Sequence, residues 1–143
     1  MALTAAPGAA SQAATQAAPA TPPIVLDSSC WLEYFNDSAR ADLFAAEAQS
    51  PTGLIVPIIT IYEVTKKLRR EISPSVAGYA ESMMRRGRII DLDIALTRLA
   101  VTYNLPLADS LIYATARMHN ATLWTQDAHF EGLAGVKYFA KSS

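Results

Sequence analysis

Short apolar runs alternate with longer segments of helical periodicity, and this alternation limits the folds open to the chain more than any other feature. The strand-like runs are 24–27, 54–56, 88–91, 121–125 and 136–139. The helix-like segments are 29–35, 39–49, 58–70, 74–86, 94–103 and 107–119. Strands that are separated by helices pair side by side in parallel, and the helices cover both faces of the sheet. The sequence therefore predicts an α/β domain with a mainly parallel central sheet between two helical layers.

The helix expected at 58–70 carries the clearest periodic pattern. Its apolar or small residues recur at offsets of three and four, as expected for one buried face of a helix. They are Ile58, Ile61, Tyr62, Thr65 and Leu68. We expect this stripe to face the core. In the next helix, Met83, Met84 and Tyr79 are expected in the core or in a groove for a partner.

The chain divides into an N-terminal extension and one domain. Residues 1–23 contain no charged side chain and are rich in Ala, Pro, Ser and Thr. They lack the basic start and the strongly apolar centre of a signal peptide. We expect residues 1–23 to be a disordered or weakly helical extension and residues 24–143 to form the folded domain, because 143 residues are too few for two ordinary domains.

Charge is segregated along the chain although the net charge is only −1. Between Lys66 and Arg88, seven Lys and Arg residues face two Glu residues, an excess of five positive charges. The near-neutral total argues against a generally basic nucleic-acid-binding protein. The local excess can attract phosphates, although a solvated helix face is equally consistent with it.

Cysteine content and hydropathy favour a reducing compartment away from the membrane. Cys30 is the only cysteine, so an intrachain disulfide is impossible. The longest apolar stretch, near 53–62, is far shorter than the ~20 residues that span a bilayer. We expect a cytoplasmic protein with no membrane partner.

Four acids lie at or near the places where an expected strand ends or an expected helix begins. Asp27 and Asp127 each close a strand-like run, Asp109 lies in the first turn of a helix, and Glu63 lies in the helix that follows the second strand. In an α/β protein, the residues after the carboxyl ends of parallel strands converge on one edge of the sheet. Carboxylates that converge repel one another unless a cation joins them, and Mg²⁺ prefers such oxygen ligands. This constellation points to a metal-dependent enzyme.

Three of the four acids, taken alone, have a simpler interpretation. Asp27 could cap the N-terminus of the following helix. Asp109 could complement its helix dipole. Glu63 has Lys67 four residues later, which would make a surface ion pair.

Four motifs together resemble a known family. They are the segments 25–29 (VLDSS), 59–64 (ITIYEV), 105–116 (LPLADSLIYATA) and 123–130 (LWTQDAHF), each of which contains one of the acids. Their order and spacing resemble those of the PIN-domain ribonucleases, and most closely the short VapC-type toxins of type II toxin–antitoxin pairs. The resemblance covers about residues 24–140 and implies a PIN-like three-layer α/β/α fold.

The resemblance also implies a site. Asp27, Glu63, Asp109 and Asp127 would be the catalytic acids and would hold Mg²⁺ or Mn²⁺ directly or through water. Thr125 and Ser29 would be supporting polar groups. Many members of the family carry another Asp two residues after the last acid, where this chain has His129. That departure leaves open whether the site has one metal position or two. His129 could be either a plain loop residue or a group that alters metal or pH preference.

The activity implied by the resemblance is hydrolysis of RNA phosphodiester bonds by a metal-dependent endoribonuclease toxin. A cognate VapB-like antitoxin would neutralise it, and tRNA, rRNA or mRNA would be the substrate. The basic residues Lys66, Lys67 and Arg70 would contact RNA or the antitoxin, and the protein would be a homodimer. Two alternatives stay open: a non-catalytic PIN module that binds RNA or a protein partner, and a PIN nuclease of RNA maturation. Other chemistries lack their motifs, because the chain has neither a phosphate-binding glycine-rich loop nor a zinc-ligand spacing.

Overall fold

Short parallel strands form the centre of the computed structural model, which describes residues 21–141. The strands are β1 (Ile24–Leu26), β2 (Leu54–Pro57), β3 (Arg88–Ile90), β4 (Thr122–Thr125) and β5 (Val136–Tyr138). The α-helices are α2 (Ser28–Phe35), α3 (Ala45–Ala48), α4 (Ile58–Glu71), α5 (Pro74–Met84), α6 (Ile94–Ala100) and α7 (Leu107–Met118). Two 3₁₀ turns, η1 (Ala41–Leu43) and η2 (Ala128–Phe130), complete the described elements.

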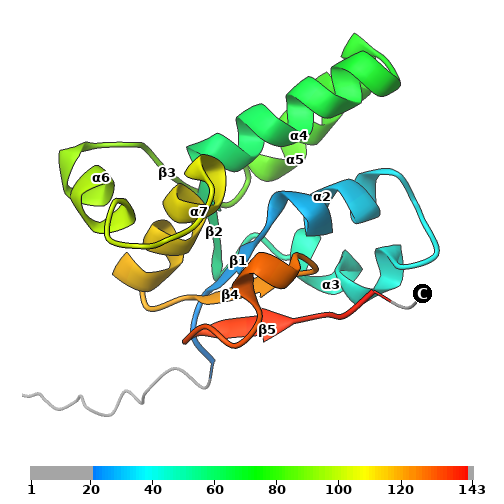
Figure 1. Ribbon diagram of the computed structural model, residues 1–143. Helices are drawn as coiled ribbons and strands as arrows, with labels where there is room; N and C mark the ends of the chain where they lie inside the picture. Colours follow the sequence, from blue (N-terminus) through cyan, green and yellow to red (C-terminus); the bar gives the residue numbers. More distant parts are fainter. Residues whose placement is uncertain (1–20, 142–143) are drawn as a thin grey trace, which may run out of the picture.

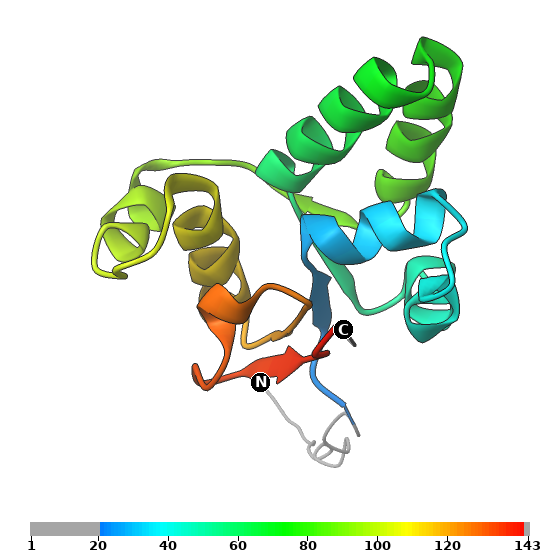
Figure 2. The ribbon, with the colours of Figure 1, turned by 45° about the vertical axis from the view of Figure 1, so that its right-hand side comes forward.

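The sheet has the order β3-β2-β1-β4-β5, and every pair in it is parallel. Helices lie on both sides of the sheet, with α2 to α5 on one side and α6 and α7 on the other (Figures 1 and 2). The predicted three-layer α/β/α fold with a parallel sheet is confirmed. The chain moves from β1 outward to β2 and β3 and then returns to the other side of β1 with β4, which makes the β1–β4 boundary the point where the strand order reverses.

Alternation along the strands divides the core into two parts. In β1, Ile24 and Leu26 pack with α2, α4 and α5, whereas Val25 packs with α7. In β4, Leu123 faces α7 and Trp124 faces the other side. Such alternation is the period-two pattern of a strand with two buried faces. The sheet is thus anchored from both sides, which fixes the positions of the residues that follow β1 and β4.

The predicted buried stripe of α4 is wrong in part. Leu68 is buried as expected, but Ile58 and Tyr62 are 43% and 56% exposed, and the buried face is formed by Thr60, Val64 and Leu68. Thr60 can be buried because its hydroxyl donates a hydrogen bond of 2.6 Å to the carbonyl of Pro57. A hydrogen-bonded hydroxyl loses little on leaving water, so the polar residue did not have to face solvent.

The helix expected at 39–49 is also wrong. The structure has the 3₁₀ turn η1 and the short α3 instead, and the break falls at Phe44, where φ is −119°. The Phe44 side chain is fully buried, with its ring 5.1 Å from that of Phe139. The tertiary packing of this ring accompanies the interruption of the local helical pattern.

Helix α5 gives a mixed outcome for its apolar residues. Met84 is fully buried, whereas Tyr79 is 58% exposed. The expected end of α6 at residue 103 is too late, because the chain leaves the helix after Ala100 and closes with short-range backbone bonds, including one of 3.1 Å from Tyr103 N to the carbonyl of Ala100. The ring of Tyr103 then packs 4.7 Å from that of Tyr113 on α7.

The expected N-terminal extension lies largely outside the described residues. At its end, the carbonyl of Pro23 accepts a hydrogen bond of 2.8 Å from Thr122 N, which continues the β1–β4 pairing. None of the helices within residues 21–141 combines the length and the apolar character that crossing a bilayer requires.

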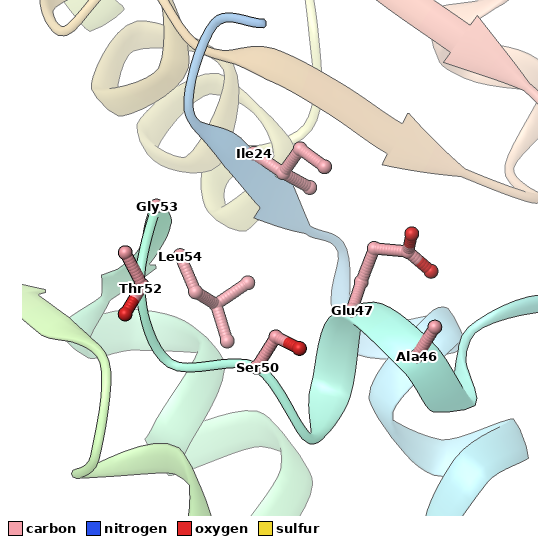
Figure 3. A pocket seen from close by; sticks show the side chains of 7 residues that line it. All are labelled: Ile24, Ala46, Glu47, Ser50, Thr52, Gly53 and Leu54. Carbon is pink, nitrogen blue, oxygen red and sulfur yellow. The ribbon is translucent and has the colours of Figure 1, made fainter.

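A hollow of about 200 Å³ opens at the amino ends of β1 and β2 (Figure 3). Ile24, Leu54 and Gly53 form its floor beside the short helix α3, which contributes Glu47. Among residues 21–141, Glu47 is the single ionisable residue in its lining. The four acids stand at the opposite, carboxyl edge of the sheet, so this hollow has no part in their chemistry.

Candidate metal centre

Each acid reaches the carboxyl edge of the sheet from its own element. Asp27 follows β1 and caps α2, and Asp127 follows β4 and caps η2. Asp109 lies in the first turn of α7, and Glu63 lies in α4, which follows β2. The β1–β4 boundary is the place where an open parallel sheet leaves a crevice for ligands. The fold therefore carries all four acids to the expected edge.

Asp109, Asp127 and His129 form the tightest group. One potential ligand atom from each residue lies within 4.8 Å of the others. His129 Nδ1 is 3.1 Å from Asp109 Oδ2 and 3.2 Å from Asp127 Oδ1. The backbone N–H of His129 also donates to Asp127 Oδ1 at 2.9 Å. The ring of His129 thus faces two of the predicted acids.

Asp27 is the buried member of the site, with 5% of its surface exposed. Asp27 is the N-cap of α2, and its Oδ1 accepts a hydrogen bond of 2.8 Å from Ser28 N. Its Oδ2 accepts hydrogen bonds from Ser29 Oγ at 3.1 Å and from Thr125 Oγ1 at 2.9 Å. The capping interpretation is therefore correct for one oxygen, while the other is held by two hydroxyls.

Thr125 connects the two acids that follow β1 and β4. Its hydroxyl donates to Asp27 and accepts a hydrogen bond of 2.9 Å from Asp127 N. Thr125 is fully buried, so its hydroxyl is fixed by these two bonds. Both predicted supporting residues, Thr125 and Ser29, lie beside Asp27.

Glu63 is turned toward α2 and not toward its neighbour in the helix. Its Oε1 accepts a hydrogen bond of 2.6 Å from Ser28 Oγ. Lys67 instead lies 3.4 Å from Glu71, and no ion pair within residues 21–141 joins Lys67 to Glu63. The interpretation of Glu63 as half of a surface pair is wrong, because the Ser28 bond fixes one of its oxygens against the start of α2.

Asp27 and Glu63 lie outside the tight group, but charge links them to it. Burial raises the pKa of Asp27 to about 6, although the hydrogen bonds from Thr125 and Ser28 lower it, and the charge of Asp109 raises it further. Burial also raises the pKa of Asp109, the hydrogen bond with His129 lowers it, and the charges of Asp127 and Glu63 raise it. The hydrogen bond with Asp109 and the charge of Asp127 raise the pKa of His129.

This donor set fits a divalent cation. Ionised Asp27 and Asp109 are disfavoured by burial and by neighbouring negative charge, and a cation would remove both penalties. The acids supply oxygen ligands of the kind that Mg²⁺ and Mn²⁺ accept, and the group with His129 has the spread of a small-ion site. Asp109, Asp127 and Asp27 could hold the ion, with Glu63 acting directly or through water.

The predicted basic residues lie next to this centre. Lys66, Lys67 and Arg70 line a groove of about 360 Å³ together with Ser28 and Glu63. Tyr62 forms part of the same wall, and its hydroxyl accepts a hydrogen bond of 3.0 Å from Lys66 Nζ. The groove runs along α4 from the acidic centre toward the end of the helix, so a chain of negative charges could extend along it.

Sequence reasoning missed two supporting groups. Ser28, which is buried and bonds Glu63, is adjacent to Asp27 in the first motif, and its position at a helix start was the available signal. Gln126 bonds Arg40 and also donates to Glu33 at 2.9 Å, which fixes the residue before Asp127 to α2. Nothing local in the sequence links Arg40 to Gln126, because 86 positions separate them.

Solved structures of toxins and toxin–antitoxin complexes are similar to this chain. The toxin–antitoxin complex from Klebsiella pneumoniae has a chain that is 26% identical, with a TM-score of 0.67, and the match covers 80% of this chain and 95% of that one. Mycobacterium tuberculosis VapC20, a sarcin-ricin loop cleaving toxin, is 18% identical with a TM-score of 0.67, covering 79% and 96%. DNA-bound VapBC from Salmonella typhimurium is 15% identical with a TM-score of 0.63, covering 83% and 98%. At such identities the latter two similarities show the fold alone.

A search among curated proteins found no match. The model of the PIN domain family matches residues 24–136, which include all four acids and His129. The resemblance found in the sequence motifs is thereby confirmed. The chain belongs to the PIN domain family.

Proposed function

We propose that this protein is a metal-dependent endoribonuclease of the VapC type, a toxin that a cognate VapB-like antitoxin holds inactive in the cytoplasm. The observation that carries the proposal is the convergence of Asp27, Glu63, Asp109 and Asp127 at the carboxyl edge of a PIN-domain sheet, beside a basic groove. The similar folds of toxin chains from toxin–antitoxin pairs support the toxin role.

The residues would divide the work as follows. Asp109, Asp127 and Asp27 hold Mg²⁺ or Mn²⁺, and the bound ion supplies a Lewis acid for water and phosphate. Thr125 and Ser29 keep Asp27 oriented through their hydroxyls. Ser28 keeps Glu63 at the rim of the centre, and a carboxylate of the cluster accepts the proton of the attacking water. The sugar–phosphate chain lies along Lys66, Lys67 and Arg70.

The antitoxin and a second copy of the chain complete the proposal. An antitoxin segment that occupied the groove of Ser28, Glu63 and Lys66 would exclude RNA from the acids by occupying the same surface. Exposed apolar side chains lie at the two ends of α6 and at the start of α7, where Ile94, Val101 and Leu107 are 64%, 76% and 80% exposed. Exposed apolar side chains of this kind suit self-association, in agreement with the proposed homodimer.

Cleavage of RNA tests the proposed activity directly. Purified protein free of antitoxin is incubated with a mixed tRNA and rRNA pool in Mg²⁺, in Mn²⁺ or in EDTA. We expect cutting in metal alone, and a loss of about 100-fold in Asp109→Asn, because this change removes one carboxylate ligand but keeps the shape of the side chain. Gels of the products report the rate.

The control for this test is Asp93→Asn, which changes an acid that caps α6 and is not part of the group of Asp109, Asp127 and His129. Asp93→Asn should cut at the wild-type rate. Equal activity of Asp109→Asn and the wild type would overturn the nuclease site. A folded wild type that binds RNA but cuts none in any metal would favour the non-catalytic PIN module. Cleavage without growth arrest on expression would favour RNA maturation.

A second prediction concerns the basic groove. The variant Lys66→Gln, Lys67→Gln should bind single-stranded RNA more weakly, and the slope of log K against log salt should fall by about 1 to 2 because up to two phosphate contacts are lost. Fluorescence anisotropy from 50 to 300 mM salt measures this slope. Arg85→Gln, Arg86→Gln, which alters basic residues at the end of α5 outside the groove lining, is the matched control. Equal slopes for both variants would place the RNA elsewhere.

A further inference from the structure

His129 places an imidazole nitrogen beside two of the carboxylates that are predicted to bind metal. Its Nδ1 faces Asp109 Oδ2 and Asp127 Oδ1 at 3.1 and 3.2 Å, so one ring nitrogen points into the same space as two predicted metal ligands. The backbone N–H of His129, in the middle of η2, donates a hydrogen bond to Asp127 Oδ1, and this bond keeps the residue beside the acid. The side chain remains 58% exposed on its other side.

We propose that His129 Nδ1 is a direct ligand of the metal ion and shifts the preference of this site from Mg²⁺ toward a first-row transition ion such as Mn²⁺. This inference rests on the proposed metal-dependent function and goes beyond it by assigning a nitrogen donor to the site. The donor set becomes the Asp109 and Asp127 carboxylates with an imidazole.

The spacing of the three side chains agrees with a shared ion. Two ligand atoms that lie ~2.1 Å from one ion are at most ~4.2 Å apart. One atom each from Asp109, Asp127 and His129 already lies within 4.8 Å of the others. The distances from His129 Nδ1 to Asp109 Oδ2 and Asp127 Oδ1, 3.1 and 3.2 Å, lie below this limit for a shared ion.

The choice of ion follows from ligand chemistry. Mg²⁺ is a hard ion that takes oxygen ligands, keeps several waters and gains little from imidazole. Transition ions accept imidazole nitrogen together with carboxylate oxygen. A nitrogen ligand therefore makes Mg²⁺ a weaker competitor of Mn²⁺ for this site. A group made only of carboxylates at the same position would make Mg²⁺ a stronger competitor.

A simpler role for the ring is to act as a counter-charge. A protonated imidazole between two carboxylates would stabilise the metal-free protein and would have to leave when an ion binds. The two roles predict opposite results on substitution. A ligand strengthens the binding of Mn²⁺, and its removal weakens it. A counter-charge competes with every cation, and its removal strengthens the binding of both ions.

Pulsed electron paramagnetic resonance of bound Mn²⁺ separates these roles, with tag-free full-length protein as the sample. The chain has only two histidines, so a nitrogen coupling can be assigned by two variants. We expect the coupling in the wild type and in His119→Gln, and its loss in His129→Asp. His119 is the C-cap of α7, where its Nδ1 lies 2.9 Å from the carbonyl of Thr115.

Calorimetric titration of Mn²⁺ and Mg²⁺ gives the second readout. The ratio of the Mg²⁺ to the Mn²⁺ dissociation constant should fall by about tenfold or more in His129→Asp and stay unchanged in His119→Gln. Absence of the coupling in the wild type, an unchanged ratio, or tighter binding of both ions in His129→Ala would overturn the inference.

The outcomes separate this inference from the proposed function. RNA cleavage that depends on metal, with no nitrogen coupling, leaves the nuclease standing and overturns the role of His129. Mn²⁺ bound through nitrogen in a protein that cuts no RNA leaves the role of His129 standing and overturns the nuclease. A protein that binds neither ion overturns both.

Discussion

Asp27→Asn should lose RNA cleavage on the order of 10³-fold while becoming more stable than the wild type in EDTA at neutral pH. Asp27 is buried and its carboxylate is the member of the site most disfavoured by loss of water, which raises its pKa from 3.8 to about 6. The amide keeps the size of the side chain and removes the charge. Activity and stability should thus move in opposite directions.

The pH dependence fixes the sign of the stability effect. Between pH 3.8 and about 6 the folded protein binds more protons at Asp27 than the unfolded chain does. The free energy of unfolding of the metal-free wild type therefore falls as pH rises through this window. The rise in the pKa of Asp27 from 3.8 to about 6 corresponds to a loss of about 2–3 kcal/mol of stability at pH 7, and this stability is fully retained below pH 3.8.

Urea unfolding of both proteins in EDTA at pH 3.5 and pH 7 measures the effect. We expect the two proteins to have nearly equal stabilities at pH 3.5 and Asp27→Asn to be more stable by about 2–3 kcal/mol at pH 7. Asp37→Asn, which changes an acid in the loop after α2, should show no such difference. A variant that is less stable than the wild type at pH 7 would mean that the hydrogen bonds of Asp27 outweigh its burial. Retained cleavage would remove Asp27 from the centre.

Phe130→Ala should cost about 3–5 kcal/mol of stability and should also weaken metal binding. Phe130 ends η2, the turn that begins after Asp127 and contains His129. Its side chain is fully buried in the core cluster next to α7, with its ring 6.3 Å from that of Tyr113. Loss of the ring leaves a cavity beneath the turn, and the turn can then move with the ligands that it carries.

The matched control is Phe44→Ala, because Phe44 is equally buried in the other core cluster and lies against Phe139. Thermal unfolding in EDTA should show a similar loss for both variants. Titration of Mn²⁺ at a temperature where both remain folded should show weaker binding in Phe130→Ala alone. Phe130→Leu, which keeps much of the volume, covers the case in which the alanine variant does not fold. Unchanged Mn²⁺ affinity in both Phe130 variants would show that the turn holds its position without the ring.

The local sequence pattern was sufficient to predict the strands and the edge of the sheet at which the acids lie. Residues of β1 and β4 are apolar on both sides of the chain, as buried parallel strands require, and Asp27 and Asp127 mark the places where these runs end. The rule that strand ends share one edge then predicted that the acids meet at that edge. Both steps depend only on neighbours along the chain and on the constant direction of parallel strands.

Packing between distant segments decided the rest. The helical pattern of 39–49 gave way to a broken segment at Phe44, whose ring packs against Phe139 at the other end of the chain. The buried face of α4 contains Thr60 because a hydrogen bond to Pro57 satisfied its hydroxyl, which hydrophobic periodicity cannot express. The partner of Glu63 proved to be Ser28, 35 positions away, although Lys67 was closer in sequence.

His129 shows the same division most clearly. The sequence by itself determined that a histidine follows Asp127 by two residues, and that an α/β sheet would carry the acids to one edge. Only the tertiary structure decided that Asp109, on a helix 20 positions earlier, meets the histidine ring. The physical reason is that periodicity records which residues avoid water, whereas the direction of a side chain depends on what the folded chain places in front of it.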